Sequence, residues 1–169
     1  AAPSLRLLHL GMNQFGLVGA EALAAALRGG AMPTLEELLL GDNPIGNQGV
    51  AALAAPLRTL PALKELDLGA CKIGDEGVAT LVAGLGKDDF KALKELLLGY
   101  NKITDAGAAK LVAAIDEGGL PKLLRCTSSL ACKRKGNAAT RAAGQYKALW
   151  AIQGALAKRS QKKKKKKKK

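Results

Sequence analysis

The chain has few of the residues on which enzyme active sites and disulfide frameworks depend. Its 169 residues include one histidine, three cysteines and 3% aromatic residues. A Ser–His–Asp or Cys–His arrangement would have to use His9, which stands between two leucines of a repeated motif on an expected open strand face. The odd number of cysteines argues against a disulfide framework and for a reducing compartment. We therefore predict a cytoplasmic protein that is not an enzyme and needs no cofactor or metal.

Long apolar runs are also missing, and one part of the chain lacks acidic residues. No run reaches the about 18–20 apolar residues of a membrane span, and the N-terminus has no signal-peptide layout. Residues 121–169 hold 17 Lys and Arg and no Asp or Glu, whereas residues 1–120 hold 10 Lys and Arg against 14 Asp and Glu. The corresponding net charges are +17 and −4. We therefore divide the chain into a domain over residues 1–120 and a basic region over residues 121–169.

What the chain does contain is one motif in four copies. The copies start at Pro3, Pro33, Pro61 and Lys91, so that successive starts lie 30, 28 and 30 residues apart. Each copy has leucines at the spacing L-x-x-L-x-L, and three residues later an Asn, or Cys71 in the third copy. A repeat of this length and spacing predicts a solenoid, in which each unit buries its leucines against the next unit.

The periodicity changes within each copy. Leucines two residues apart predict a short strand with one buried side and one open side. The strands are expected near residues 7–9, 37–39, 65–67 and 95–97. The second half of each copy has Leu or Val at helical spacing and many alanines, which favour a helix. The helices are expected over residues 20–27, 50–57, 78–85 and 106–115. Pro56 is expected to end the second helix early, and the Asn residues or Cys71 to bond the backbone of the turns as a ladder.

The long, alanine-rich repeat with a G-x-x-G segment after the Asn position resembles the ribonuclease-inhibitor-like class of leucine-rich repeats. That class also occurs in NOD-like receptors and in Ran GTPase-activating proteins. The resemblance covers residues 3–120 and implies an α/β leucine-rich-repeat solenoid, with short parallel strands on the concave face and helices on the convex face. It also implies a scaffold that binds other proteins, rather than a shared chemistry. Because no capping element precedes Pro3, we expect the sequence to start inside a longer protein.

A fifth copy starts correctly with Gly119-Leu120-Pro121 and Leu123 and then loses the pattern, because Cys126 and Ser128 stand at the next leucine positions. We therefore read residues 121–169 as a degenerate fifth repeat followed by a basic tail. Three interpretations of this region stay open. The first is an artefact, because a poly(A) tail read as coding sequence would yield the run Lys162–Lys169. The second is a genuine disordered tail that binds RNA, DNA or an anionic membrane surface, with a nuclear location as one consequence.

The third interpretation is a C-terminal cap, which is compatible with either of the others. Residues 138–158 can be drawn as a helix with one apolar face, which includes Ile152 and Leu156. This face could cover the last repeat.

The open side of the predicted strands gives the candidate binding residues. Aligning the repeats brings equivalent positions into columns, and the candidate partner-binding residues in those columns are Glu37, Leu39, Glu65, Asp67, Glu95, Leu97 and Tyr100. One reading is an ordinary solvated face. The other is a mildly acidic groove with apolar anchors for a basic protein partner. The repulsion among the three glutamates is tolerable only if solvent, the neighbouring Lys64 and Lys94, or a basic partner screens them from one another.

The leading functional hypothesis is a non-catalytic scaffold that reversibly binds a protein partner. We expect this scaffold to be a fragment of a larger leucine-rich-repeat protein. The first alternative is GTPase regulation of the Ran GTPase-activating type, which rests on the resemblance alone. The second alternative is nucleic-acid binding through the lysine run, which requires that run to be genuine.

Overall fold

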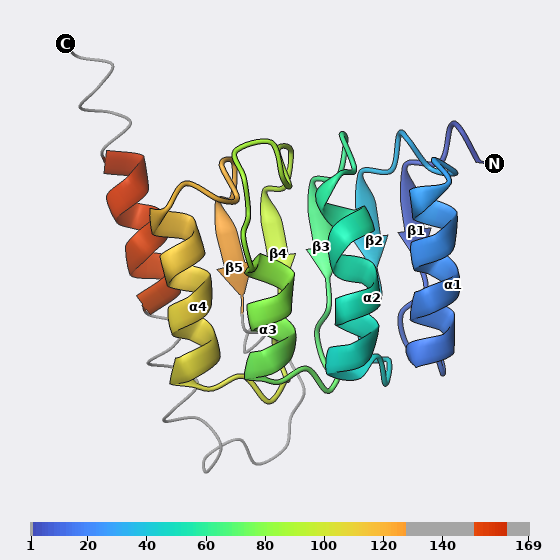
Figure 1. Cartoon of the computed structure of the whole chain (residues 1–169), viewed down its shortest axis with the longest axis horizontal. Helices are drawn as coiled ribbons and strands as arrows, with labels where there is room; N and C mark the ends of the chain where they lie inside the picture. Colours follow the sequence, from blue (N-terminus) through green and yellow to red (C-terminus); the bar gives the residue numbers. More distant parts are fainter. Residues whose placement is uncertain (1, 128–150, 162–169) are drawn as a thin grey trace.

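The structure, a computed structural model of the chain, describes residues 2–127 and 151–161. Within residues 2–127, strands and helices alternate as the repeats predict (Figure 1). In chain order the elements are β1 (Leu7–His9), α1 (Leu17–Arg28), β2 (Glu37–Leu39), α2 (Gly46–Arg58), β3 (Glu65–Asp67), α3 (Asp75–Val82), β4 (Glu95–Leu97), α4 (Asp105–Asp116) and β5 (Arg125–Thr127). Residues 151–161 form a further helix that follows the last repeat.

The five strands form one parallel sheet in the order β1-β2-β3-β4-β5. Equivalent repeat positions pair directly, so Leu38 lies opposite Leu66 and Leu66 opposite Leu96. Helices α1 to α4 stand in a row on one side of the sheet (Figure 1), and none of the described helices covers its other side, which we call the open strand face. The four expected strands and the α/β solenoid are thereby confirmed, and β5 extends the sheet by one strand.

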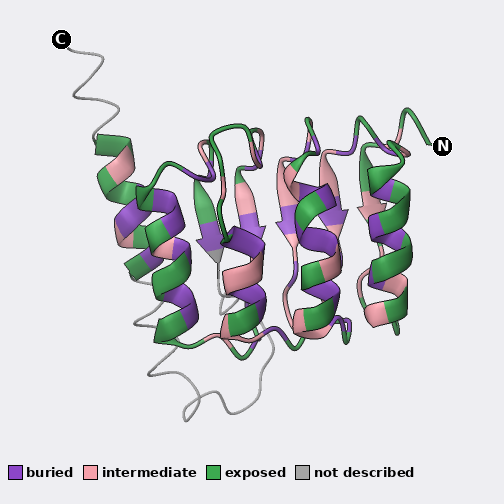
Figure 2. Ribbon diagram, in the orientation of Figure 1, coloured by how far each residue is buried: buried purple, intermediate pink, exposed green. Residues whose placement is uncertain are grey.

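The core lies between the sheet and the row of helices (Figure 2). Leu66 and Leu96 are 0% and 1% exposed, and the helices meet them with side chains such as Leu53 and Leu81. In β1, by contrast, Leu8 is only partly buried, because it lies in the first strand of the sheet. Stacking of successive repeats therefore forms the core, since no single repeat encloses its own leucines.

The expected asparagine ladder joins the turns that follow the strands. Oδ1 of Asn43 accepts from the backbone N–H groups of Asn13 and Phe15 at 3.1 and 3.0 Å, and its Nδ2 donates to the carbonyls of Leu10 and Leu40 at 2.8 Å each. These bonds satisfy backbone groups that would otherwise be buried without a partner. In this way each turn is fixed to the turn of the preceding repeat.

The helices differ from the expected ranges at both ends. They begin earlier than expected, and in α2 and α3 the first turns contain glycine and polar residues that carry no hydrophobic periodicity. The third helix ends at Val82 rather than at residue 85, and the guanidinium of Arg58 donates to the carbonyls of Thr80 and Leu81 at 2.6 and 3.0 Å. The side chain of a neighbouring helix therefore satisfies carbonyls that another helical turn would have bonded.

The expectation that Pro56 ends its helix early was wrong. Pro56 lies inside α2, which continues to Arg58. A proline removes one backbone donor and clashes with the carbonyl four residues before it. The last turn of α2 nevertheless contains Pro56. At this end of the helix, Oγ1 of Thr59 donates a hydrogen bond to the carbonyl of Pro56 at 3.0 Å.

The last repeat is covered by the helix over residues 151–161. Cys126 takes the leucine position of β5 and is 1% exposed, and Ile152 and Leu156 join the same core. Nε2 of Gln153 donates to the carbonyl of Cys126 at 2.8 Å, and Arg159 donates to that of Leu120 at 2.7 Å. This is the arrangement that the cap interpretation expects. Residues 138–150 of the drawn helix and the run over residues 162–169 lie outside the described residues.

Candidate protein-binding surface

The three candidate glutamates begin their strands at equivalent positions. Glu37 pairs with Glu65 in the sheet, and Glu65 pairs with Glu95. Neighbouring strands lie about 4.8 Å apart, so the three carboxylates form a continuous column, which we call the acidic column. All three residues are partly buried. The sequence alignment of the repeats therefore placed these residues correctly relative to one another.

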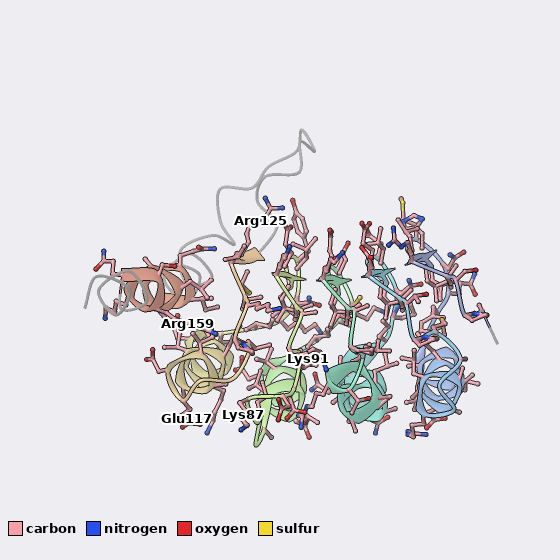
Figure 3. All side chains as sticks on the ribbon, turned by 90° about the horizontal axis from the view of Figure 1, so that it is seen from above. Lys87, Lys91, Glu117, Arg125 and Arg159 are labelled. Carbon is pink, nitrogen blue, oxygen red and sulfur yellow. The ribbon has the colours of Figure 1, made fainter. Side chains whose placement is uncertain are left out.

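A cation closes the acidic column at one end. Arg125 is the next residue in register after Glu95, and its Nη2 lies 2.6 Å from Oε2 of Glu95. Figure 3 shows Arg125 on the side of the sheet that faces away from the helices. Sequence reasoning missed this residue because the fifth repeat had lost its leucines. Counting 30 residues from Glu95, the spacing between the third and fourth starts, would have found it.

The middle of the acidic column is electrostatically unfavourable for a negative charge. Partial burial raises the pKa of Glu65 above its usual value, and repulsion from Glu95, Glu37 and Asp67 raises it further. Arg125 opposes these effects only weakly. Among residues 2–127 and 151–161, neither Glu37 nor Glu65 forms an ion pair. The column thus retains two carboxylates that an external cation could stabilise.

The neighbouring column combines apolar and acidic side chains. Leu39 pairs with Asp67, and Asp67 with Leu97, and all three are partly buried. Oδ1 of Asp67 accepts from the backbone N–H of Gly69 at 2.8 Å. A Cβ at Gly41 would lie 2.9 Å from Oδ2 of Asp67, so a side chain at that position would displace this carboxylate. The carboxylate is therefore held over the sheet.

Tyr100 follows β4 and projects into solvent with 55% of its surface exposed. Its φ is 56°, in the left-handed region. The equivalent residues Met12, Asp42 and Ala70 have φ values of 61°, 58° and 53°. We call these four residues the left-handed row. Met12 is 71% exposed, so the row carries a large apolar side chain near each end of the sheet.

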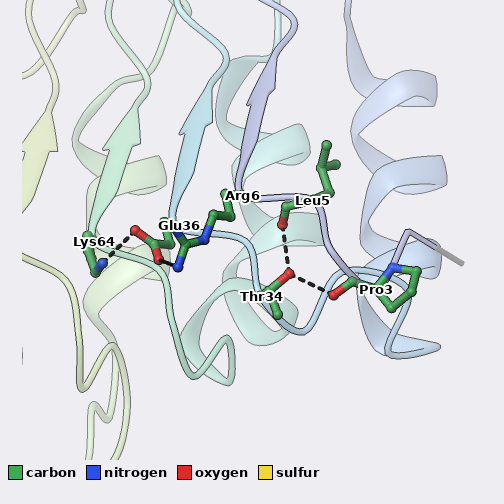
Figure 4. Close-up of polar contacts among 6 residues, drawn as sticks. All are labelled: Pro3, Leu5, Arg6, Thr34, Glu36 and Lys64. Carbon is green, nitrogen blue, oxygen red and sulfur yellow. Dashed lines mark hydrogen bonds and ion pairs between the residues drawn. The ribbon is translucent and has the colours of Figure 1, made fainter.

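Of the three possible sources of screening for the glutamates, the structure does not support Lys64. Its Nζ lies 2.5 Å from Oε2 of Glu36, and Arg6 lies 3.3 Å from Oε1 of the same residue (Figure 4). The hydrogen bond from Lys64 lowers the pKa of Glu36. Neither Lys64 nor Lys94 is among the charges that act on Glu65. Lys64 and Lys94 belong to a separate row together with Glu36, because each of these residues precedes its strand by one position. Figure 4 also shows Thr34, whose hydroxyl donates to the carbonyls of Pro3 and Leu5 at 2.8 and 3.0 Å.

Two further observations concern other kinds of site. Within the described part of the chain, no group of three or more His, Cys, Asp or Glu residues could hold a metal ion. No helix among those residues is long and apolar enough to cross a membrane. The seven candidate residues all lie on or directly beside the open strand face, and their role in binding stays a prediction.

Comparison with known proteins agrees with this architecture. The family described as "Leucine Rich repeat" matches residues 1–24, 31–54, 59–82 and 92–112, which together are more than half of the chain. Among solved structures, the leiomodin-1 actin-binding site 2 is similar, with a TM-score of 0.69 at 13% sequence identity. The match covers 98% of this chain and 86% of that chain. At this identity the similarity concerns the fold alone. A search of curated protein sequences finds no significant match.

Proposed function

Since the chain belongs to the leucine-rich repeat family, we propose that it is a scaffold that binds a basic protein partner on its open strand face. The observation that carries the proposal is the acidic column, in which Glu37 and Glu65 lack a cationic partner among the described residues. Apolar side chains lie beside this column: Leu39 and Leu97 in the neighbouring column, and Tyr100 directly after β4.

The charges and the apolar groups would serve different steps of binding. Carboxylates that share one face attract a cationic partner during its approach and raise the association rate. The exposed ring of Tyr100 and the partly buried Leu97 offer contact area that desolvates when the partner docks. Aromatic anchors near charged residues are common in protein interfaces. The surface therefore supports a protein ligand better than a small molecule.

Other features are consistent with this proposal but are less direct. The name of the leiomodin-1 structure states that it binds actin, so a fold of this kind can present a protein-binding surface. We further propose that the repeats are of the ribonuclease-inhibitor-like class, because their starts lie 28–30 residues apart and three of the four copies contain G-x-x-G. We also propose a cytoplasmic location, since Cys71 and Cys126 are free thiols. No arrangement within residues 2–127 or 151–161 favours GTPase regulation or nucleic-acid binding over a protein ligand.

The test is affinity capture from a cell extract with the full chain and two variants of the surface. One variant carries Glu65→Lys and Glu95→Lys, and the other carries Tyr100→Ala. We expect both to lose partners that the unmodified chain retains, because the first repels a basic partner and the second removes apolar contact area. The matched control carries Glu21→Lys and Asp116→Lys, which make the same change of charge at exposed positions on α1 and α4. Retention of every partner by both surface variants would exclude the strand face as the binding site.

A further inference from the structure

We infer that Arg125 acts as an internal competitor for the acidic column and thereby determines where a partner's cation binds. The inference rests on the proposed function and adds a specificity-determining residue to it. It follows from the contact between the guanidinium of Arg125 and the carboxylate of Glu95.

The contact has the geometry that a partner's arginine would adopt. Arg125 reaches Glu95 from the adjacent strand, one register position along the sheet, with Nη2 and Oε2 separated by 2.6 Å. Its side chain is 58% exposed, so it approaches the carboxylate from the solvent side of the sheet. A charged hydrogen bond of this length is shorter and stronger than one between neutral groups. The chain's own guanidinium thus occupies the acidic column at the β4 end.

Occupation of Glu95 leaves the β2–β3 end of the acidic column for the partner. Glu37 and Glu65 pair with each other in register and have no ion pair among the described residues. Burial and repulsion hold the pKa of Glu65 above its usual value, so a new cation beside this carboxylate would relieve an unfavourable charge. The partner's cation therefore binds over β2 and β3, near the start of the strands.

The most exposed apolar side chain of the surface, Tyr100, lies at a different place, and this difference orients a partner that contacts it. Leu97 ends β4 and Tyr100 follows it, whereas Glu37 and Glu65 begin β2 and β3. A partner that uses Tyr100 as its apolar anchor therefore places its cation and its apolar side chain on a diagonal across the sheet, whereas Leu39 lies in the same strand as Glu37. If Arg125 did not hold Glu95, the cation could also bind directly beside Leu97, and the orientation would be less defined.

The expected effect of removing the competitor is modest. Exposed ion pairs measured in other proteins are weak, and their strength corresponds to about two- to fivefold in an equilibrium constant. Arg125→Gln should therefore tighten binding of a cationic peptide by about two- to fivefold. The change should depend on Glu95, because Arg125 acts by occupying that carboxylate.

The experiment measures the anisotropy of a short fluorescein-labelled arginine-rich peptide during titration with the full chain. An ionic strength of about 0.15 M limits the reach of each charge to about 8 Å, so that distant charges contribute little. The matched control is Arg6→Gln, which removes the same charge from an exposed residue that pairs with Glu36 outside the acidic column. Arg125→Gln should tighten binding, and Arg6→Gln should change it by less than about twofold.

A double-mutant cycle isolates the mechanism. The gain from Arg125→Gln should disappear in a chain that also carries Glu95→Gln, because no carboxylate is then released. Equal effects of Arg125→Gln and Arg6→Gln, or a gain that persists without Glu95, would overturn the inference while leaving the proposed function intact. Failure of the proposed function has a different signature, in which Glu65→Lys together with Glu95→Lys leaves peptide affinity unchanged. An absence of measurable binding by both the wild-type chain and Arg125→Gln would contradict the two together.

Discussion

The backbone N–H of Cys71 donates to Oδ1 of Asn101 at 2.9 Å and joins the third repeat to the fourth. Oδ1 of Asn101 also accepts from the N–H of Ile73 at 3.0 Å, while its Nδ2 donates to the carbonyl of Leu68 at 2.7 Å. One amide side chain thus satisfies several buried backbone groups in two repeats. The stability of the inter-repeat contact should depend on it.

We predict that Asn101→Ala lowers the free energy of unfolding by about 1–3 kcal/mol, because buried donors and acceptors lose their partners. Asn13→Ala is the matched control, since Asn13 is exposed and, among the described residues, its amide donates to the carbonyls of Leu10 and Gly11 within its own repeat. Its effect should be smaller. Urea titrations of both variants measure the difference, and similar midpoints would refute the role assigned to Asn101.

Cys71 should be chemically inert in the folded protein. Burial raises the pKa of its thiol to about 11, and Sγ lies 3.3 Å from the carbonyl oxygens of Leu40 and Gly69, to which it donates. Because the thiolate is the reactive form, iodoacetamide should leave Cys71 unmodified near neutral pH and modify it in urea. Mass spectrometry of the peptide that contains Cys71 measures this. Rapid alkylation of the folded chain would show that the thiol is not held as described.

The same ladder position should accept an asparagine. Cys71→Asn restores the residue found in the other three copies, and its amide can bond the turn of the second repeat as Asn43 bonds that of the first. We expect a urea midpoint at or above that of the unmodified chain. A clear loss of stability would mean that the turn around Cys71 has adapted to the smaller side chain.

Asp75 should make stability depend on pH in the acid range. Partial burial acts to raise its pKa, but hydrogen bonds from Thr104 and from the backbone of Gly107 outweigh this effect and lower the pKa. Its two oxygens accept from the N–H and hydroxyl of Thr104 at 2.7 and 2.6 Å. A lowered pKa means that the carboxylate stabilises the fold above its unfolded-state pKa, and that this contribution is lost as pH falls through the folded-state pKa.

The corresponding experiment compares the unmodified chain with Asp75→Asn over a pH series. The difference in urea midpoint should be largest above the unfolded-state pKa and should shrink on acidification. Asp116→Asn, at an exposed position in the last turn of α4, is the control for the loss of one carboxylate. A difference between the chain and Asp75→Asn that does not vary with pH would contradict the assignment.

The contribution of Glu65 to stability should change with pH in the opposite direction to that of Asp75. Burial, and then repulsion by neighbouring carboxylates, raises its pKa, so its ionised form destabilises the fold above the folded-state pKa. Glu65→Gln should therefore raise the urea midpoint near neutral pH, and the gain should vanish as pH falls below the unfolded-state value. Glu95→Gln is the matched variant and should not stabilise, because it loses the ion pair with Arg125. A neutral-pH loss of stability in Glu65→Gln would show that other contacts of this residue dominate.

The repeat period predicted the strands well because strand position follows directly from the leucine spacing. Every strand from β1 to β4 lies where the alternation placed it, and the register of Glu37, Glu65 and Glu95 follows from the same count. The helix ends were harder to predict from the sequence. The side chain of Arg58 in α2 bonds the carbonyls at the end of α3, which would otherwise bond the next turn of that helix. No local pattern in either segment encodes that contact.

The end of the solenoid shows why a weak motif can still form a strand. Leucine was expected at the position of Cys126, yet the parallel hydrogen bonds to β4 involve only the backbone, and a cysteine is apolar enough to be buried there. Once β5 exists, Arg125 must lie beside Glu95. Sequence analysis therefore missed Arg125 because it required leucines in the fifth repeat, although the backbone pairing of β5 with β4 does not need them.

In the left-handed row, substitutions that would raise thermal stability would also remove side chains that could contact a partner. A residue other than glycine in this conformation costs about 1–2 kcal/mol, and glycine at that position would relieve the strain. Variants selected only for survival at high temperature should therefore accumulate glycine at Met12, Ala70 and Tyr100. Such a selection would remove the exposed ring of Tyr100 while leaving the sheet intact, so an engineered thermostable form of this scaffold would have to acquire its stability at other positions.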